Sequence, residues 1–278
     1  MQNIANYEIN QGDWSKFLAT ERERIKILHG VSVVVCFSLM AMAGWSQTAP
    51  VAAAAPTPVD TAKQIATMEA RLADWPQLAK YRSANAALAP AAEGEDRVIF
   101  FGASMTEFWG RNGTSFFPGK PYVNRGISGQ TTAQMVVRFR QDVIDLHPKA
   151  VVILAGTNDV AGNTGPMTAE MTENNWQSMA DLAKANGIRV IFASITPSTD
   201  FWWHKGLKPA EKIRTLNAWL KGYCESHGLI YLDYYSALTD EEGGMKKEFT
   251  VDGVHASAKG YAVMAPLAQA AIDRTLAK

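Results

Sequence analysis

The chain has 278 residues, of which 47% are hydrophobic and 19% charged, and its 27 basic residues balance its 27 acidic ones. This length and composition are typical of a soluble globular protein with enough chain to bury a large core. Because there is no net charge and no run of Lys and Arg interleaved with aromatic residues, the sequence gives no indication of nucleic-acid binding.

Residues 1–59 are predicted to be an export signal followed by a linker. Three cations between residues 21 and 30 precede an apolar run of about 14 residues that begins at Val31. This run is shorter than the ~20 residues that a membrane-spanning helix needs, and small residues suitable for cleavage follow it. We therefore expect an exported protein, periplasmic or secreted, with no stable membrane span after processing. An uncleaved anchor is the alternative, whereas lipid attachment at Cys36 is disfavoured by the bulky Val35 before it.

A single domain is expected over residues 60–278, with a helical lead-in over 60–96. It follows a linker at 47–58 that is rich in Ala, Pro and Thr. A second short helix is expected at 78–88. The first helix of the lead-in is indicated by apolar residues at helical spacing, namely Ile65, Met68, Leu72 and Trp75.

Beyond Arg97, short apolar runs alternate with longer amphipathic stretches. The runs predict strands at 98–101, 121–123, 150–154, 189–193 and 229–232, and the stretches predict helices at 132–146, 168–186, 209–226 and 258–276. Such alternation implies an α/β domain in which helices cover both faces of a parallel sheet. Cys224 lies within a helical pattern and is predicted to be a buried core thiol rather than a reactive one.

Polar residues capable of catalysis occur where these predicted strands end. Ser104, Gly126 and Asn158 come just after the first, second and third strands, and His255 lies between the fifth strand and the last helix. In an open parallel sheet, ligands bind outside the carboxyl ends of the strands. The topology therefore predicts that these four residues meet at one edge of the sheet.

A serine beside a histidine predicts nucleophilic catalysis. A serine hydroxyl becomes an effective nucleophile only when a neighbouring base takes its proton. His255 is the expected base for Ser104, and Asp252, three residues earlier, can orient its ring. The alternatives are that Ser104 caps a helix, and that Asp252 caps the last helix with His255 as a surface residue.

Three donors are expected to stabilise a developing oxyanion. They are the backbone N–H groups of Ser104 and Gly126 and the side-chain amide of Asn158. For Gly126 and Asn158 the alternative is turn formation, since Gly and Asn tolerate left-handed conformations. Glu107 and Asp159 are expected to brace loops rather than to act as catalytic acids.

The four segments, in this order and spacing, resemble the SGNH (GDSL) hydrolase superfamily over about Arg97 to Lys278. They are Gly102-Ala103-Ser104, Asn124-Arg125-Gly126, Gly156-Thr157-Asn158-Asp159 and Asp252-Gly253-Val254-His255. The resemblance implies a flavodoxin-like three-layer α/β/α sandwich with about five parallel strands. It also implies ester hydrolysis by a triad of Ser104, Asp252 and His255, with Ser104, Gly126 and Asn158 as the oxyanion hole. Ala103 stands where the family has Asp, so we expect slower turnover.

Aromatic residues near the predicted strand ends are candidates for substrate binding. Phe108, Trp109, Trp202 and Trp203 could line an acyl pocket or stack on a sugar, or could form a local hydrophobic cluster. The sequence thus predicts a carboxylic ester hydrolase without metal or cofactor, acting on a small-molecule or glycan ester, with acetylated carbohydrate favoured. A catalytically weak or inactive carbohydrate-binding member of the same fold is the alternative. Nucleotide binding is disfavoured because both glycine-rich phosphate motifs are absent.

Overall fold

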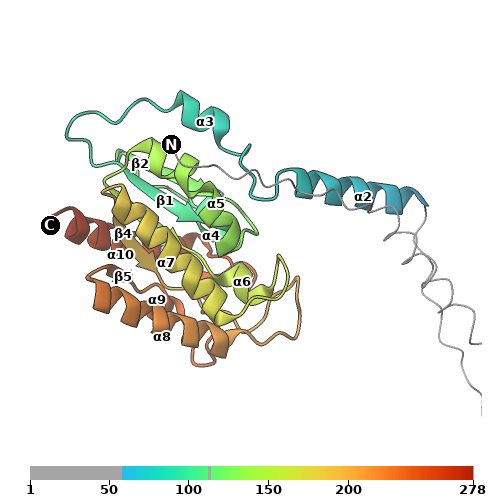
Figure 1. The fold of residues 1–278 in the computed structure, drawn as a ribbon. Helices are drawn as coiled ribbons and strands as arrows, with labels where there is room; N and C mark the ends of the chain where they lie inside the picture. The colour runs from blue at the N-terminus through green and yellow to red at the C-terminus, as the bar shows by residue number, and fades with distance from the viewer. Residues whose placement is uncertain (1–57, 112–113, 278) are drawn as a thin grey trace, which may run out of the picture. The chain divides into compact units, whose positions relative to one another are not determined.

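The computed structural model describes residues 58–111 and 114–277 (Figure 1). The predicted export signal and nearly all of the predicted linker lie outside these described residues. Among the helices of the described part, none is long and apolar enough to cross a membrane.

Five parallel strands form the central sheet, in the order β2-β1-β3-β4-β5. The strands are β1 (Val98–Gly102), β2 (Tyr122–Gly126), β3 (Ala150–Leu154), β4 (Arg189–Ala193) and β5 (Ile230–Leu232). The predicted α/β class and the all-parallel sheet are confirmed. The register aligns the last residue of β1 with the last residues of β2 and β3, so these three strands end at one level.

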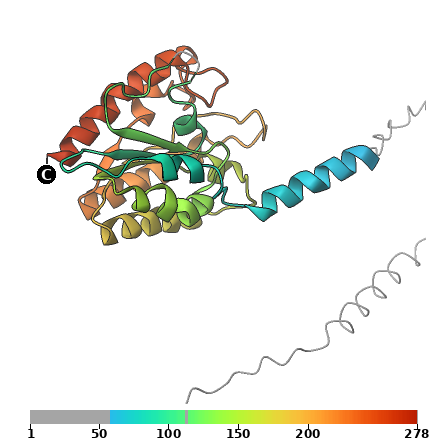
Figure 2. The same ribbon diagram turned by 90° about the horizontal axis from the view of Figure 1, so that it is seen from above.

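Helices cover both faces of the sheet and make three layers (Figure 2). One face carries α5 (Thr132–Asp142), α7 (Ala169–Ala185) and α8 (Ala210–His227), and the other carries α10 (Ala258–Leu276). The lead-in contains α2 (Pro58–Ala73) and α3 (Arg82–Ala87). The remaining elements are short: α4 (Ser104–Glu107), α6 (Thr157–Ala161), α9 (Tyr235–Leu238) and the 3-10 helices η1 (Ile144–Leu146) and η2 (Lys247–Phe249).

Alternate residues of each strand pack into two separate cores. In β1, Ile99 and Phe101 pack with α5, α7 and α8, whereas Val98 and Phe100 pack on the side of α10. Burial of both strand faces is why the predicted strands read as continuous apolar runs. Cys224 on α8 has no exposed surface, which confirms the predicted core thiol, and burial raises the pKa of its thiol to about 12.

Strand β2 extends three residues beyond its predicted end at residue 123 because its polar residues find partners. Asn124 donates to the Thr106 carbonyl at 2.5 Å, and Arg125 Nε donates to Asn85 Oδ1 at 2.7 Å. Gly126 is therefore the last residue of the strand rather than a residue of the following turn.

The lead-in contacts the end of β2 and the loop after it through its turns. Pro76 O accepts a hydrogen bond from Gln130 Nε2 at 2.8 Å, and the Tyr81 hydroxyl donates to the carbonyl of Gly126. The second helix is shorter than predicted, and Trp75 follows the end of α2 instead of lying within it. The apolar side chains of Ile65, Met68 and Leu72 on α2 are exposed.

A fully buried arginine joins the ends of β1 and β2. Arg138 on α5 donates to the carbonyls of Gly102 and Arg125, each at 2.9 Å, and to Gln130 Oε1 at 2.5 Å. It also pairs with the buried carboxylate of Asp142 at 3.1 Å. Burial lowers the pKa of the Arg138 guanidinium to about 10, so this side chain remains a cation at neutral pH.

Arg138→Met should lower the free energy of unfolding by about 3–5 kcal/mol, because Asp142 would remain as a buried charge without its partner. Arg140→Met on the same helix is the matched control, since its side chain is 67% exposed and its ion pair with Asp145 spans 3.9 Å. This control should cost less than about 1 kcal/mol. Urea unfolding followed by circular dichroism measures both free energies. Equal decreases in the two variants would contradict the inference that Arg138 holds the ends of β1 and β2 together.

Candidate active site

Ser104 is the first residue of α4 and is separated from the end of β1 by one residue, Ala103. Ala103 occupies the N-cap position of this helix, so the alternative in which Ser104 is the cap is wrong. The Ser104 hydroxyl is half-buried, and its Oγ lies 2.9 Å from Nε2 of His255, a residue 151 positions away in sequence.

Asp252 fixes the imidazole of His255 from the opposite side. Its Oδ2 lies 2.7 Å from His255 Nδ1, and its Oδ1 accepts the backbone N–H groups of Val254 at 3.0 Å and His255 at 2.7 Å. Burial by itself would raise the pKa of the Asp252 carboxyl, but these hydrogen bonds outweigh it and hold the pKa below its ordinary value. The N-cap of α10 is Ser257, so Asp252 does not cap that helix.

Asn158 lies on α6 with only 4% of its surface exposed. Its Nδ2 donates to the Gln130 carbonyl at 2.9 Å, and its Oδ1 accepts a hydrogen bond from Asn163 Nδ2 at 2.8 Å. A side-chain amide carries two N–H donors, so one donor of Asn158 has no acceptor among the described residues.

The prediction that the Gly126 N–H is an oxyanion donor is wrong. This N–H donates to Asn124 Oδ1 at 2.9 Å. A Cβ atom at residue 126 would lie 2.1 Å from the backbone nitrogen of Glu107. Glycine is therefore required here because α4 packs directly on the end of β2, and not because a substrate approaches.

Gly129, three residues further along, is a candidate that the sequence reasoning missed. It occupies the turn before α5 with a left-handed φ of 79°, and its carbonyl accepts a hydrogen bond from Asn163 at 3.2 Å. Its N–H forms no hydrogen bond with another residue of the described chain. The turn pair Ser128-Gly129 before a helix is the signal that could have indicated it.

The turn that carries Ser104 is held by its neighbours on both sides. The Met105 carbonyl accepts the Tyr261 hydroxyl at 2.9 Å, and the Thr106 carbonyl accepts Asn124 Nδ2 at 2.5 Å. Ala103 offers no side-chain oxygen, so α4 has no side-chain cap. The carbonyls of Met105 and Thr106 therefore connect this turn to α10 and β2.

Glu107 braces the loop after β2, as expected. It accepts the Ser128 N–H at 2.6 Å and pairs with Lys80 at 3.1 Å and Arg111 at 3.0 Å. Burial would raise the pKa of Glu107, but these partners hold it below its ordinary value.

Asp159 also acts as a brace, as expected. Its carboxyl accepts hydrogen bonds from the backbone N–H and hydroxyl of Thr132, which ties α6 to the start of α5. Burial raises the pKa of Asp159.

The aromatic candidates divide into three kinds. The Phe108 ring lies 5.3 Å from the His255 ring, which places it at the site. Trp202 is 60% exposed, while Trp203 stacks on Phe201 at 5.0 Å. Trp109 is only 4% exposed and packs among other aromatic rings of the core, so the prediction that it binds substrate is wrong.

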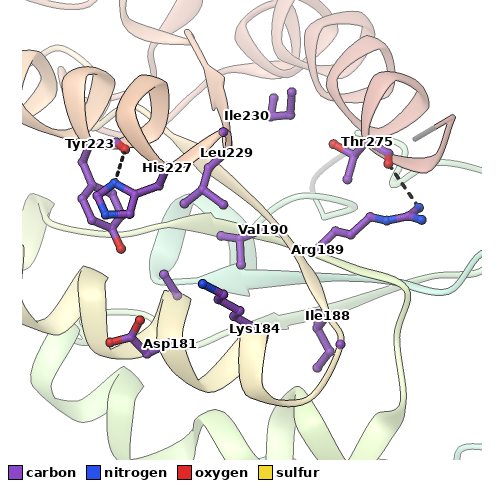
Figure 3. Close-up of a pocket in the computed structure, with 13 residues that line it drawn as sticks. Asp181, Lys184, Ile188, Arg189, Val190, Tyr223, His227, Leu229, Ile230 and Thr275 are labelled. Carbon is purple, nitrogen blue, oxygen red and sulfur yellow. Dashed lines mark hydrogen bonds between the residues drawn. The ribbon is translucent and has the colours of Figure 1, made fainter.

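A separate pocket of about 450 Å³ lies at the opposite edge of the sheet (Figure 3). It is lined by the ends of α7 and α8 and by the amino-terminal ends of β4 and β5, including Lys184, Arg189 and His227. Since Ser104 follows the carboxyl end of β1, this pocket belongs to another part of the fold. Among the described residues, no three or more His, Cys, Asp or Glu side chains gather as metal ligands.

Comparison with known proteins agrees with this geometry. The sequence profile of the GDSL-like Lipase/Acylhydrolase family matches residues 100–263. The chain belongs to this family. The match begins in β1 and ends in α10, so it includes every residue of the Asp252–His255–Ser104 arrangement.

Solved structures of other proteins share the fold. A candidate acylhydrolase from Bacteroides fragilis is 44% identical, with a TM-score of 0.71, over 73% of this chain and 98% of that one. A catalytic mutant of an acetylxylan esterase from Geobacillus stearothermophilus is 19% identical, with a TM-score of 0.53, over 66% of this chain and 95% of that one. The second likeness concerns the fold alone.

The sequence is also similar to an uncharacterised lipoprotein, YqeF, of Bacillus subtilis. The two are 27% identical over 128 residues, which is 45% of this chain and 44% of YqeF. The match thus spans less than half the length of this curated relative.

Proposed function

We propose that this acylhydrolase cleaves carboxylic esters with Ser104 as nucleophile, His255 as general base and Asp252 as the residue that orients the base. The observation that carries the proposal is that the His255 ring contacts both other residues. Its Nδ1 lies 2.7 Å from Asp252 Oδ2, and its Nε2 lies 2.9 Å from Ser104 Oγ. Both distances allow hydrogen bonds, and nucleophile, base and orienting carboxylate are the three parts that acyl transfer requires.

In the proposed reaction, His255 Nε2 takes the Ser104 proton while Ser104 Oγ attacks the ester carbonyl carbon. The tetrahedral oxyanion is stabilised by the N–H groups of Ser104 and Gly129 and by Asn158 Nδ2. The bond to the leaving alkoxide breaks as His255 returns the proton to it, leaving an acyl-serine. Water, deprotonated by His255, then releases the carboxylic acid and restores Ser104.

Gly129 replaces Gly126 in this proposal for two reasons. The Gly129 N–H has no partner among the described residues. In addition, the side-chain NH2 group of Asn163 donates both to the Gly129 carbonyl and to Asn158 Oδ1, which links Gly129 to Asn158. The Gly126 N–H, by contrast, is occupied by Asn124. A turn with positive φ can expose consecutive backbone N–H groups to an anion.

Ser104→Ala should abolish hydrolysis of p-nitrophenyl acetate, because it removes the nucleophile without removing any hydrogen bond that supports the fold. Circular dichroism and urea unfolding should give values for the variant equal to those of the parent protein. A serine-reactive phosphonate should label the parent at Ser104 and leave the variant unlabelled. Unchanged turnover by the variant would refute the assignment.

The dependence of kcat/KM on pH tests the role of His255. Only a neutral imidazole can accept the Ser104 proton, so kcat/KM should rise between about pH 5 and pH 8 as imidazolium gives way to neutral imidazole. The lowered pKa of Asp252 means that its carboxyl is already ionised and adds no second step there. Initial rates measured over about pH 5–8 give the profile of kcat/KM. A flat profile would contradict the assignment of His255 as the base.

For the substrate class, we propose a short-chain ester, with acetylated carbohydrate favoured. Trp202 supports this choice because its indole is 60% exposed and packs against Trp203, which in turn donates a hydrogen bond to Asn163. The acetylxylan esterase that shares the fold acts on a substrate of this kind.

We also propose that the protein is exported. The proposal is supported by the N-terminal sequence and by the name of YqeF as a lipoprotein.

A carbohydrate-binding protein without hydrolytic activity is the second candidate. Ala103, in place of the family Asp, and the exposed Trp202 favour it. The p-nitrophenyl acetate assay separates the two, because only the esterase turns this ester over.

Trp202→Ala should raise KM for acetylated xylo-oligosaccharides about 2- to 10-fold, as expected for the loss of one ring contact. Hydrolysis of p-nitrophenyl acetate should be unchanged, because that ester is too small to need a second stacking surface. Acetate release measured over a concentration series of both substrates gives the comparison. An unchanged KM for the oligosaccharide would mean that Trp202 does not contact the carbohydrate. Hydrolysis rates over a series of esters of increasing acyl-chain length should then define the substrate.

A further inference from the structure

A chain of hydrogen bonds leads from the aromatic loop, residues 199–207, to the side chain of Asn158. Trp203 Nε1 donates to Asn163 Oδ1 at 3.0 Å. Asn163 Nδ2 donates to Asn158 Oδ1 at 2.8 Å, and Asn158 Nδ2 donates to the Gln130 carbonyl at 2.9 Å. Two side-chain amides thus lie in series between an indole N–H and a backbone carbonyl.

The two ends of this series fix the direction of every amide within it. An indole N–H can only donate, and a backbone carbonyl can only accept. The Asn163 oxygen must therefore face Trp203, its NH2 group must face Asn158, and the Asn158 oxygen must face Asn163. Turning either amide over would place oxygen against oxygen on one side and N–H against N–H on the other, and both hydrogen bonds would be lost.

Asn163 has no free donor in this arrangement, whereas Asn158 has one. The second N–H of Asn163 reaches the Gly129 carbonyl at 3.2 Å. Asn158 uses one N–H for Gln130 and accepts from Asn163 with its oxygen, which leaves one N–H for a substrate oxyanion. Asn163 thus also contacts Gly129, the residue proposed as another oxyanion donor.

Local backbone structure holds Asn163 in this position. Gly162 ends α6 with a left-handed φ of 71°, and the Asn163 N–H then folds back to the Asn158 carbonyl at 3.0 Å. On the other side, the aromatic loop is fixed to α6 by a 2.7 Å contact between His204 Nδ1 and the Ala161 carbonyl. Both partners of Asn163 are thereby fixed before any substrate binds.

We propose that Asn163 is a positioning residue that orients the oxyanion donor Asn158 and connects it to the loop that carries Trp202 and Trp203. Asn163 does not touch the reacting atoms and acts through Asn158. The inference rests on the proposed function, since it requires Asn158 to stabilise an oxyanion.

Asn163→Asp and Asn163→Leu, assayed with p-nitrophenyl acetate, test this role. Asp keeps the shape and can accept from Trp203, but its carboxylate cannot donate to Asn158, while Leu removes both bonds without adding charge. Each should lower kcat about 10- to 100-fold, with KM changed less than about threefold, since a donor to the transition state is misdirected rather than removed. Asn186→Asp is the matched control, because Asn186 is exposed at the opposite edge of the sheet and should leave kcat unchanged.

A double-variant cycle distinguishes positioning from a general structural effect. Asn158→Ala alone should lower kcat by about 10²–10³. Adding Asn163→Leu to it should lower kcat by a further factor of less than about 3, because no amide remains to be oriented. Full multiplication of the two effects would overturn the inference, and so would an unchanged kcat in both Asn163 variants.

Trp203→Phe provides a second test that leaves Asn163 in place. It keeps a ring to stack on Phe201 but removes the N–H that fixes the Asn163 amide, so kcat should fall several-fold while the unfolding midpoint stays close to that of the parent. An unchanged kcat in this variant would also count against the inference. If Asn163 variants retain full activity while Ser104→Ala is inactive, the positioning role fails and the proposed esterase function stands.

Discussion

The guanidinium of Arg138 is the group on which the arrangement of the site depends, because it satisfies acceptors from separate segments at once. It donates to the carbonyl of Gly102 at the end of β1 and to the carbonyl of Arg125 near the end of β2. Its Nε bonds Gln130, whose backbone carbonyl in turn holds Asn158. Buried carbonyls without donors are costly, so the strand ends and the loop after β2 are fixed together by one side chain.

Around this centre, the site is built from very short elements. Ser104 is the first residue of α4, which has four residues, and Asn158 is the second residue of α6, which has five. Helices this short have little stability of their own. Their positions are set instead by side chains from elsewhere, such as Tyr261 at the Met105 carbonyl and Thr132 at the carboxyl of Asp159. The lead-in belongs to this support, although the family match starts only at residue 100.

Sequence reasoning predicted the parts of the molecule that follow from simple periodicity. β3 and β4 lie at their predicted residues, and the strand ends bring Ser104, Asn158 and His255 to one edge. It failed where polar residues continue a strand. Asn124 and Arg125 hid the true end of β2, and Gly126 was therefore expected to have a free N–H, whereas this N–H donates to Asn124. Trp109 was misjudged because proximity in sequence to Ser104 says nothing about which face of the sheet a ring packs against.

Cys224 is the one cysteine in the described part of the chain, and it is fully buried with a thiol that stays protonated at neutral pH. Thiolates, not thiols, react with oxidants and disulfides. Within the described residues, a reducing agent therefore has no disulfide to break, and an oxidant meets no accessible thiolate at Cys224.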